Sequence, residues 1–104
     1  MTDLTSLSVR VQNVLRNEGG EIDAAKWLLS HLVDYHEIPN FGRVSLVELV
    51  NHLGFDMDCV EWSQYGSRDR AARFVFHHFL IGRLEPEPAL RLIGRYMGWN
   101  VPAK

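Results

Sequence analysis

The sequence predicts an all-α fold, a compact single-domain bundle of five or six short helices. Three observations lead to this prediction. Apolar residues recur at three- and four-residue spacing along most of the chain, which is the period of one helix face. Glycine and proline divide the chain into short segments. At 104 residues, of which 46% are hydrophobic and 23% charged, the chain has room for one domain with one core.

The first predicted helix covers about residues 3–17 and ends at Gly19-Gly20. Its apolar residues are spaced for one helix face; they are Leu4, Leu7, Val11 and Val14. The second predicted helix covers about residues 22–36 and ends before Pro39. Because apolar residues occupy a wide arc of this second helix, we expect it to lie centrally in the bundle.

The third predicted helix has the best-marked start. Ser45 followed by Glu48 forms the pattern of a capping box. In such a box the serine side chain accepts the backbone N–H three residues on, and the glutamate reaches back to the N–H of the serine. Val44 and Leu49 can close a hydrophobic staple around this start. The helix should end at Gly54.

Three further segments complete the prediction. A short helix is expected at about residues 57–65, and a longer one at residues 67–81. The residues expected on the buried side of the longer helix are Ala71, Ala72, Val75, Phe76 and Phe79. The last helix should begin near Pro86 and end at Gly98, because proline suits a first turn and glycine a C-terminus.

The central segment at about residues 45–65 resembles a helix-turn-helix motif. The residues that match its spacing are Leu49-Val50, Leu53-Gly54-Phe55 and Val60. The resemblance implies that apolar residues of the first helix pack on one of the second, across a glycine turn. The second helix, however, carries Asp56, Asp58 and Glu61 and no basic residue, and carboxylates oppose entry into a groove lined by phosphates. We therefore expect the motif to serve a structural role, with DNA binding as the alternative.

Charge is divided along the chain. Residues 1–66 carry four basic and ten acidic residues, whereas residues 67–104 carry seven basic and three acidic residues. Nine of the eleven basic residues are arginines, whose planar guanidinium suits phosphate or carboxylate. The sequence therefore predicts one acidic and one arginine-rich surface, unless the fold pairs the two internally.

Arginine and aromatic residues supply the candidate binding surface, because exposed Arg, Trp and Tyr side chains anchor many protein–protein interfaces. On the helix at residues 67–81, Arg70, Arg73 and His77 form one stripe. Local i,i+4 pairs of Asp69 with Arg73 and of Glu87 with Arg91 would neutralise part of this charge. The residues predicted to bind a partner are Arg68, Arg70, Arg73, His77, Trp62, Tyr65, Phe41 and Arg95.

No catalytic or metal-binding motif is present in the sequence. The five histidines and the single cysteine lack the spacing of HExxH or of paired CxxC sites. The chain has no glycine-rich phosphate loop either. We therefore expect no catalytic residue, no metal and no cofactor, and a protein that is not an enzyme.

The function predicted from these features is that of a small, non-catalytic, intracellular binding protein: an adaptor, inhibitor or regulator acting through a protein–protein interface. Cys59 is the only cysteine, which fits a reducing, cytoplasmic location. No apolar stretch is long enough to span a membrane, and no secretory signal is visible, so we expect no membrane partner.

Two alternatives stay open at this point. The first is a helix-turn-helix DNA-binding transcriptional regulator, with DNA and a second copy of the chain, in a homodimer, as partners. The second makes the acidic residues Asp56, Asp58 and Glu61 the active surface of an inhibitor of a nucleic-acid-binding protein, of the kind that mobile elements make.

Overall fold

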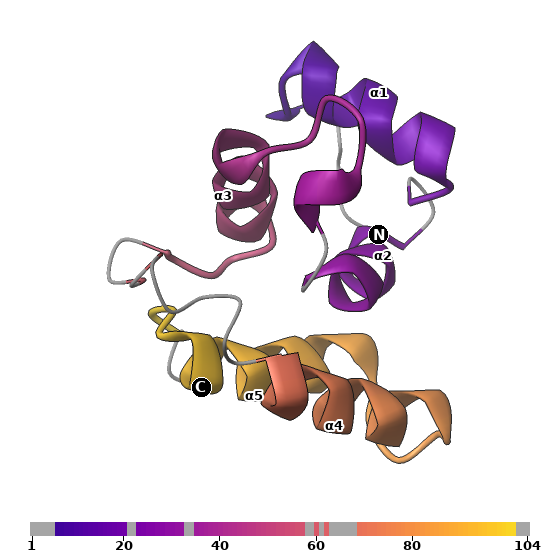
Figure 1. Ribbon diagram of the computed structural model, residues 1–104, viewed down its shortest axis with the longest axis vertical. Helices are drawn as coiled ribbons and strands as arrows, with labels where there is room; N and C mark the ends of the chain where they lie inside the picture. The colour runs from indigo at the N-terminus through magenta and orange to yellow at the C-terminus, as the bar shows by residue number, and fades with distance from the viewer. Residues whose placement is uncertain are drawn as a thin grey trace.

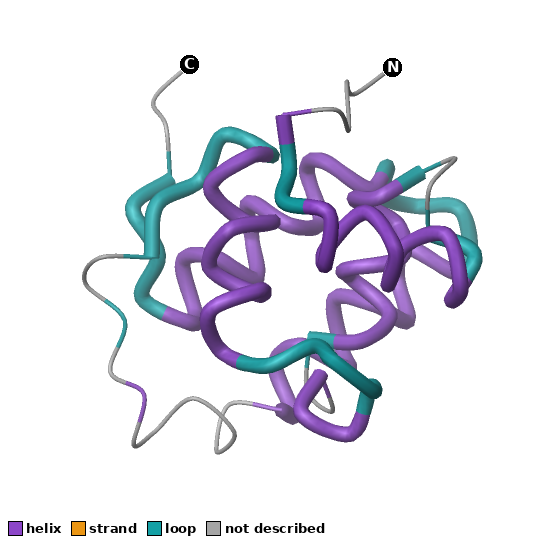
Figure 2. Tube along the Cα trace, turned by 90° about the horizontal axis from the view of Figure 1, so that it is seen from above, coloured by secondary structure: helices purple, strands orange, loops and turns teal. Residues whose placement is uncertain are grey.

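All regular secondary structure in the described part of the chain is helical, which confirms the predicted all-α fold (Figure 1). The computed structural model describes residues 6–20, 23–32, 35–57, 60, 62 and 69–101, with residues 69–72 described by their backbone alone. The helices are α1 (Val9–Glu18), α2 (Ala24–His31), α3 (Arg43–His52), α4 (Asp69–Leu80) and α5 (Pro86–Met97), with a 3-10 turn, η2, at Tyr35–Glu37. Figure 2 shows no strand among these residues.

The helices are arranged in two halves. In Figure 1, α4 and α5 lie side by side at the bottom, and α1, α2 and α3 form the upper half. Helix α5 packs against both α4 and α2, whereas α1 packs on α3. The two halves form one compact body, because its extents of 31 × 30 × 28 Å are nearly equal.

The core is built mainly from α1, α2, α3 and α5. The largest fully buried side chains are Val11, Leu15, Leu28, Leu32, Leu46, Leu49, Val50, Leu90 and Ile93. On α4, only Val75 is buried among the side chains that the structure describes. Helix α4 therefore covers α5 from outside and leaves much of its own surface in solvent.

Both N-terminal helices are shorter than predicted. Helix α1 starts at Val9, because the Ser8 side chain accepts the Val11 N–H at 3.4 Å and caps the helix. It ends at Gly19, as predicted, with a left-handed φ of 80°. Helix α2 starts at Ala24, where the Asp23 carboxylate accepts the Lys26 N–H at 3.0 Å.

The predicted capping box of α3 is wrong. Helix α3 begins at Arg43, with Gly42 as its N-cap, and Ser45 is buried inside the first turns. Val44 is 80% exposed and closes no hydrophobic staple. The Glu48 carboxylate accepts the backbone N–H of Ser8, forty residues earlier in the chain. A tertiary contact between α3 and the start of α1 thus replaces the local contact that the sequence pattern suggests.

This contact leads to a prediction about stability. Replacing Glu48 by alanine should lower the free energy of unfolding by about 1 kcal/mol, because the first turn of α1 loses a charge-assisted hydrogen bond to α3. Urea denaturation measures the change. Glu37→Ala, at an exposed position on η2, is the matched control and should change stability little. Equal losses in both variants would contradict the role given to Glu48.

The helix-turn-helix prediction is tested only in its first half. Helix α3 is followed by Gly54 with a φ of 97°, and the next residue, Phe55, is buried, as is Val60. Asp56 is not in a helix: its backbone forms an antiparallel bridge with Asn100, with N···O distances of 3.1 and 2.6 Å. The short helix predicted at residues 57–65 falls largely outside the described residues.

The two C-terminal helices agree with the prediction. Helix α4 spans Asp69–Leu80 and is connected to α5 by a short turn that contains Gly82. Helix α5 begins at Pro86 and ends at Gly98, whose φ of 84° is left-handed. The predicted pair of Glu87 and Arg91 is present at 3.2 Å.

Candidate functional site

Exposed apolar side chains are concentrated on the helix pair formed by α4 and α5. Six large hydrophobic side chains are exposed in the described part of the chain, and four of them belong to this pair or its connecting turn. They are Phe74 (64% exposed), Leu80 (61%), Ile81 (50%) and Tyr96 (55%). The other two, Val9 and Val44, lie in the opposite half of the molecule.

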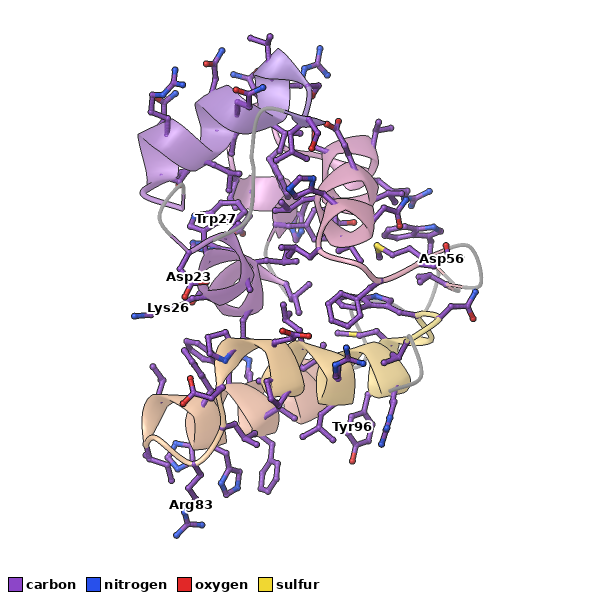
Figure 3. The ribbon with its side chains drawn as sticks, turned by 180° about the vertical axis from the view of Figure 1, so that it is seen from behind. Asp23, Lys26, Trp27, Asp56, Arg83 and Tyr96 are labelled. Carbon is purple, nitrogen blue, oxygen red and sulfur yellow. The ribbon has the colours of Figure 1, made fainter. Side chains whose placement is uncertain are left out.

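Basic side chains are exposed on the same helix pair. Arg73 and His77 are exposed on α4, Arg83 in the turn and Arg95 on α5. Figure 3 shows Arg83 and Tyr96 pointing away from α2, on the side of the molecule opposite to Trp27. We call this set the α4–α5 outer surface; its residues are Arg73, Phe74, His77, Leu80, Ile81, Arg83, Arg95 and Tyr96.

The surface has this composition because α4 is apolar around most of its circumference. Val75 is buried in the core, and the half-buried Phe76 and Phe79 stack on each other with ring centroids 5.9 Å apart. Phe74 lies on another side of the helix, where its ring meets the His78 ring edge-on at 4.5 Å. One helix cannot bury all these residues against a single neighbour, so some of them remain in solvent.

The predicted partner-binding residues divide into three groups. Arg73, His77 and Arg95 are exposed on the α4–α5 outer surface. Arg70 lies on α4, where the structure describes its backbone alone. Arg68 and Tyr65 lie outside the described residues. The remaining two, Trp62 and Phe41, are described and do not belong to this surface.

Trp62 lies beside α3 in the other half of the molecule. It is half-buried, and the Arg43 guanidinium sits 4.6 Å from its ring centroid in a cation–π contact. Phe41 is only 3% exposed, so the expectation that it reaches a partner is wrong. Its ring meets the rings of Trp27 and Tyr35 edge-on, with centroids 5.3 and 6.5 Å away, which makes it part of the core.

The acidic alternative is described only in part. Asp58 and Glu61 lie outside the described residues. Asp56 is half-buried and accepts a hydrogen bond from the Asn100 side chain at 3.3 Å, in addition to the backbone bridge. Of the ten acidic residues in the first 66, five are described, and two more of these five also make structural contacts: Asp23 caps α2 and Glu48 binds Ser8.

Sequence reasoning missed Phe74, Leu80, Ile81 and Tyr96 as surface residues. A signal was available for the first three, since the run from Phe74 to Ile81 has more apolar residues than one helix face holds. Tyr96 gave no such signal. Its exposure follows from the way α5 is rotated against α4 and α2, which local sequence does not specify.

A cleft of about 310 Å³ beside α2 is an alternative site; it is lined by Gly19, Asp23, Lys26, Trp27, Ser30 and His31. Its polar groups already make contacts within α2. Ser30 donates to the Lys26 carbonyl at 3.0 Å, and His31 Nδ1 lies 2.8 Å from the Trp27 carbonyl oxygen. Lys26 points outward in Figure 3. These side chains do not converge on a ligand.

Among the described residues, no group of three or more His, Cys, Asp or Glu side chains is arranged to hold a metal ion. None of their helices has the length and apolar character needed to cross a membrane.

Comparison with known proteins gives no relative: the chain matches no family model, no curated protein and no solved structure. The function is therefore inferred from the residues of the α4–α5 outer surface.

Proposed function

We propose that this chain is a small, non-catalytic binding protein that docks a partner protein through the α4–α5 outer surface. The observation that carries the proposal is the exposure of Phe74, Leu80, Ile81 and Tyr96 together on the outermost helix pair. Exposed apolar clusters with a polar rim mark interaction sites, since solvent exposure of such side chains opposes stability and solubility.

The chemistry of the surface supports a protein partner. Aromatic side chains and arginines are the residue types that supply most binding energy at interfaces. Phe74 and Tyr96 offer large rigid areas, and Arg83 and Arg95 can hydrogen-bond carboxylates at the rim. An adaptor, an inhibitor or a regulator would use such a surface by tethering its partner or by covering the partner's own site.

The location proposed with this function is intracellular. The single cysteine, Cys59, supports it, because secreted domains of this size commonly depend on disulfides and this chain can form none internally.

The proposal is tested by affinity capture with paired surface variants. Phe74→Ser combined with Leu80→Ser removes two apolar side chains from the α4–α5 outer surface. Val9→Ser combined with Val44→Ser removes the same kind of side chain from the opposite half and is the control. We expect a partner to be recovered with wild type and with the control, and lost with the first variant.

Two outcomes would contradict the proposal. One is a partner that is retained by the Phe74/Leu80 variant, which would place the interface elsewhere. The other is steeply salt-dependent binding of duplex DNA by the wild type, measured by fluorescence anisotropy, which would favour the helix-turn-helix alternative. The unfolding free energy of each variant is measured as well, and only variants that are as stable as wild type are compared. Misfolding is then not mistaken for lost binding.

A further inference from the structure

We infer that the α4–α5 outer surface receives an acidic amphipathic helix of its partner protein. This inference rests on the proposed function and specifies the chemistry of the partner segment. Its grounds are the charge of the surface, the spacing of its apolar side chains and the lack of a strand edge in the described part of the chain.

The charge of the surface is positive along the whole of the exposed stretch. Residues 73–84 contain Arg73, Arg83 and two histidines and no aspartate or glutamate. Helix α5 adds Arg95. The acidic Glu87 is turned elsewhere, because it pairs with Arg91 and lines a cleft with Ala25 and Phe55 towards the other half. Among the described side chains of α4, α5 and the turn between them, the one other acidic residue is Glu85, at the N-cap of α5. A segment that complements this surface carries carboxylates.

The apolar side chains favour a helical segment. Phe74 on α4 and Ile81, the first residue after this helix, are seven residues apart, which is about two helical turns or roughly 10 Å. An amphipathic helix laid along α4 repeats its own apolar residues over the same distance, so both rows can meet. Partners that bind as an added strand need an unpaired sheet edge, and the described residues contain only the isolated bridge of Asp56 and Asn100.

A second copy of this chain fits the surface less well. In a two-fold dimer the α4–α5 outer surface would face itself, since both subunits of such a dimer contribute the same patch. Arg73, Arg83 and Arg95 of one copy would then approach the same arginines of the other. Like charges oppose that contact, whereas an acidic helix is attracted.

The test is a selection from a displayed library of random peptides long enough for several helical turns. The bait is the wild-type chain of 104 residues. Peptides that also bind the Phe74→Ser/Leu80→Ser variant are discarded, because they bind elsewhere on the protein. We expect the retained peptides to combine Asp or Glu with apolar residues at three- and four-residue spacing. Their affinity should fall with added salt and should fall about tenfold in the Arg83→Glu/Arg95→Glu variant. The double variant Arg10→Glu/Arg16→Glu, at two exposed positions of α1, is the charge-matched control and should leave affinity unchanged.

Several results would overturn the inference. If the selected peptides were neutral or basic and still depended on Phe74 and Leu80, the inference of an acidic partner would be wrong, but the proposed docking surface would be supported. The absence of any peptide that depends on these two residues would overturn both. Salt-sensitive dimerisation of the wild type, measured by sedimentation equilibrium, would assign the surface to a second copy of the chain. Binding to anionic vesicles that the Arg83/Arg95 variant loses would assign it to a lipid surface.

Discussion

Replacing Gly20 by alanine should destabilise the protein by about 2 kcal/mol. A Cβ at this position would lie 2.6 Å from Trp27 Cγ and 2.9 Å from Leu15 Cδ2. A shift of Trp27 would disturb two ring contacts, because His31 stacks on its ring at 4.7 Å and Phe41 meets it edge-on at 5.3 Å. The loss would be a large share of the roughly 5–15 kcal/mol by which small domains are stable.

Urea denaturation followed by tryptophan fluorescence measures this effect, and Gly42→Ala is the matched control. A Cβ at Gly42 meets nothing within 4 Å, and the residue precedes α3 in an extended conformation. We expect the control to lose less than about 1 kcal/mol, from its weaker N-cap alone. Equal losses in the two variants would show that Trp27 does not pack against Gly20 in solution.

Replacing Phe74 by alanine should weaken partner binding by about 30-fold or more while leaving the unfolding free energy nearly unchanged. An aromatic residue at the centre of an interface commonly contributes 2 kcal/mol or more, and each 1.4 kcal/mol is about tenfold in affinity. Stability should change little, because the Phe74 side chain is 64% exposed and, among described contacts, meets mainly the His78 ring. Titration calorimetry with the captured partner or with a selected peptide measures the change.

Two further variants decide what Phe74 contributes. Phe74→Tyr keeps the ring and should bind within a few-fold of wild type. Phe76→Ala removes a half-buried ring of the same helix, which stacks on Phe79, and should lower stability more than it lowers affinity. If Phe74→Ala lowered stability and left affinity intact, Phe74 would be a structural residue and not an anchor of the interface.

The helices themselves were predictable where the signals were local. Helix α5 begins at Pro86 and ends at Gly98 as expected, and α1 ends at Gly19. Proline in a first turn and glycine with positive φ set a helix end through the few residues next to them. Ser45 and Glu48 also formed a good local pattern, and it failed. The Glu48 side chain found a partner forty residues away, at Ser8, which no local pattern contains.

The candidate site divides in the same way. Arg73, His77 and Arg95 could be identified from charge and helical spacing, and the structure places all three in solvent. Phe41 could not be assigned correctly, since a phenylalanine in a loop beside a proline gives no indication of whether it points inward. Only the packing of Trp27 and Tyr35 around it places it in the core.

The amino-acid sequence was sufficient to specify an all-α chain, most helix ends and an excess of positive charge in its last third, because these depend on residue type and short-range spacing. The tertiary structure decided that α4 packs on α5 and that Phe74, Leu80 and Ile81, together with Tyr96 of α5, remain exposed to solvent. That outcome depends on which face of α5 each neighbouring helix covers. The apolar faces of several helices compete for burial in one core, and these helices lie too far apart in the sequence for a local pattern to predict which faces are buried.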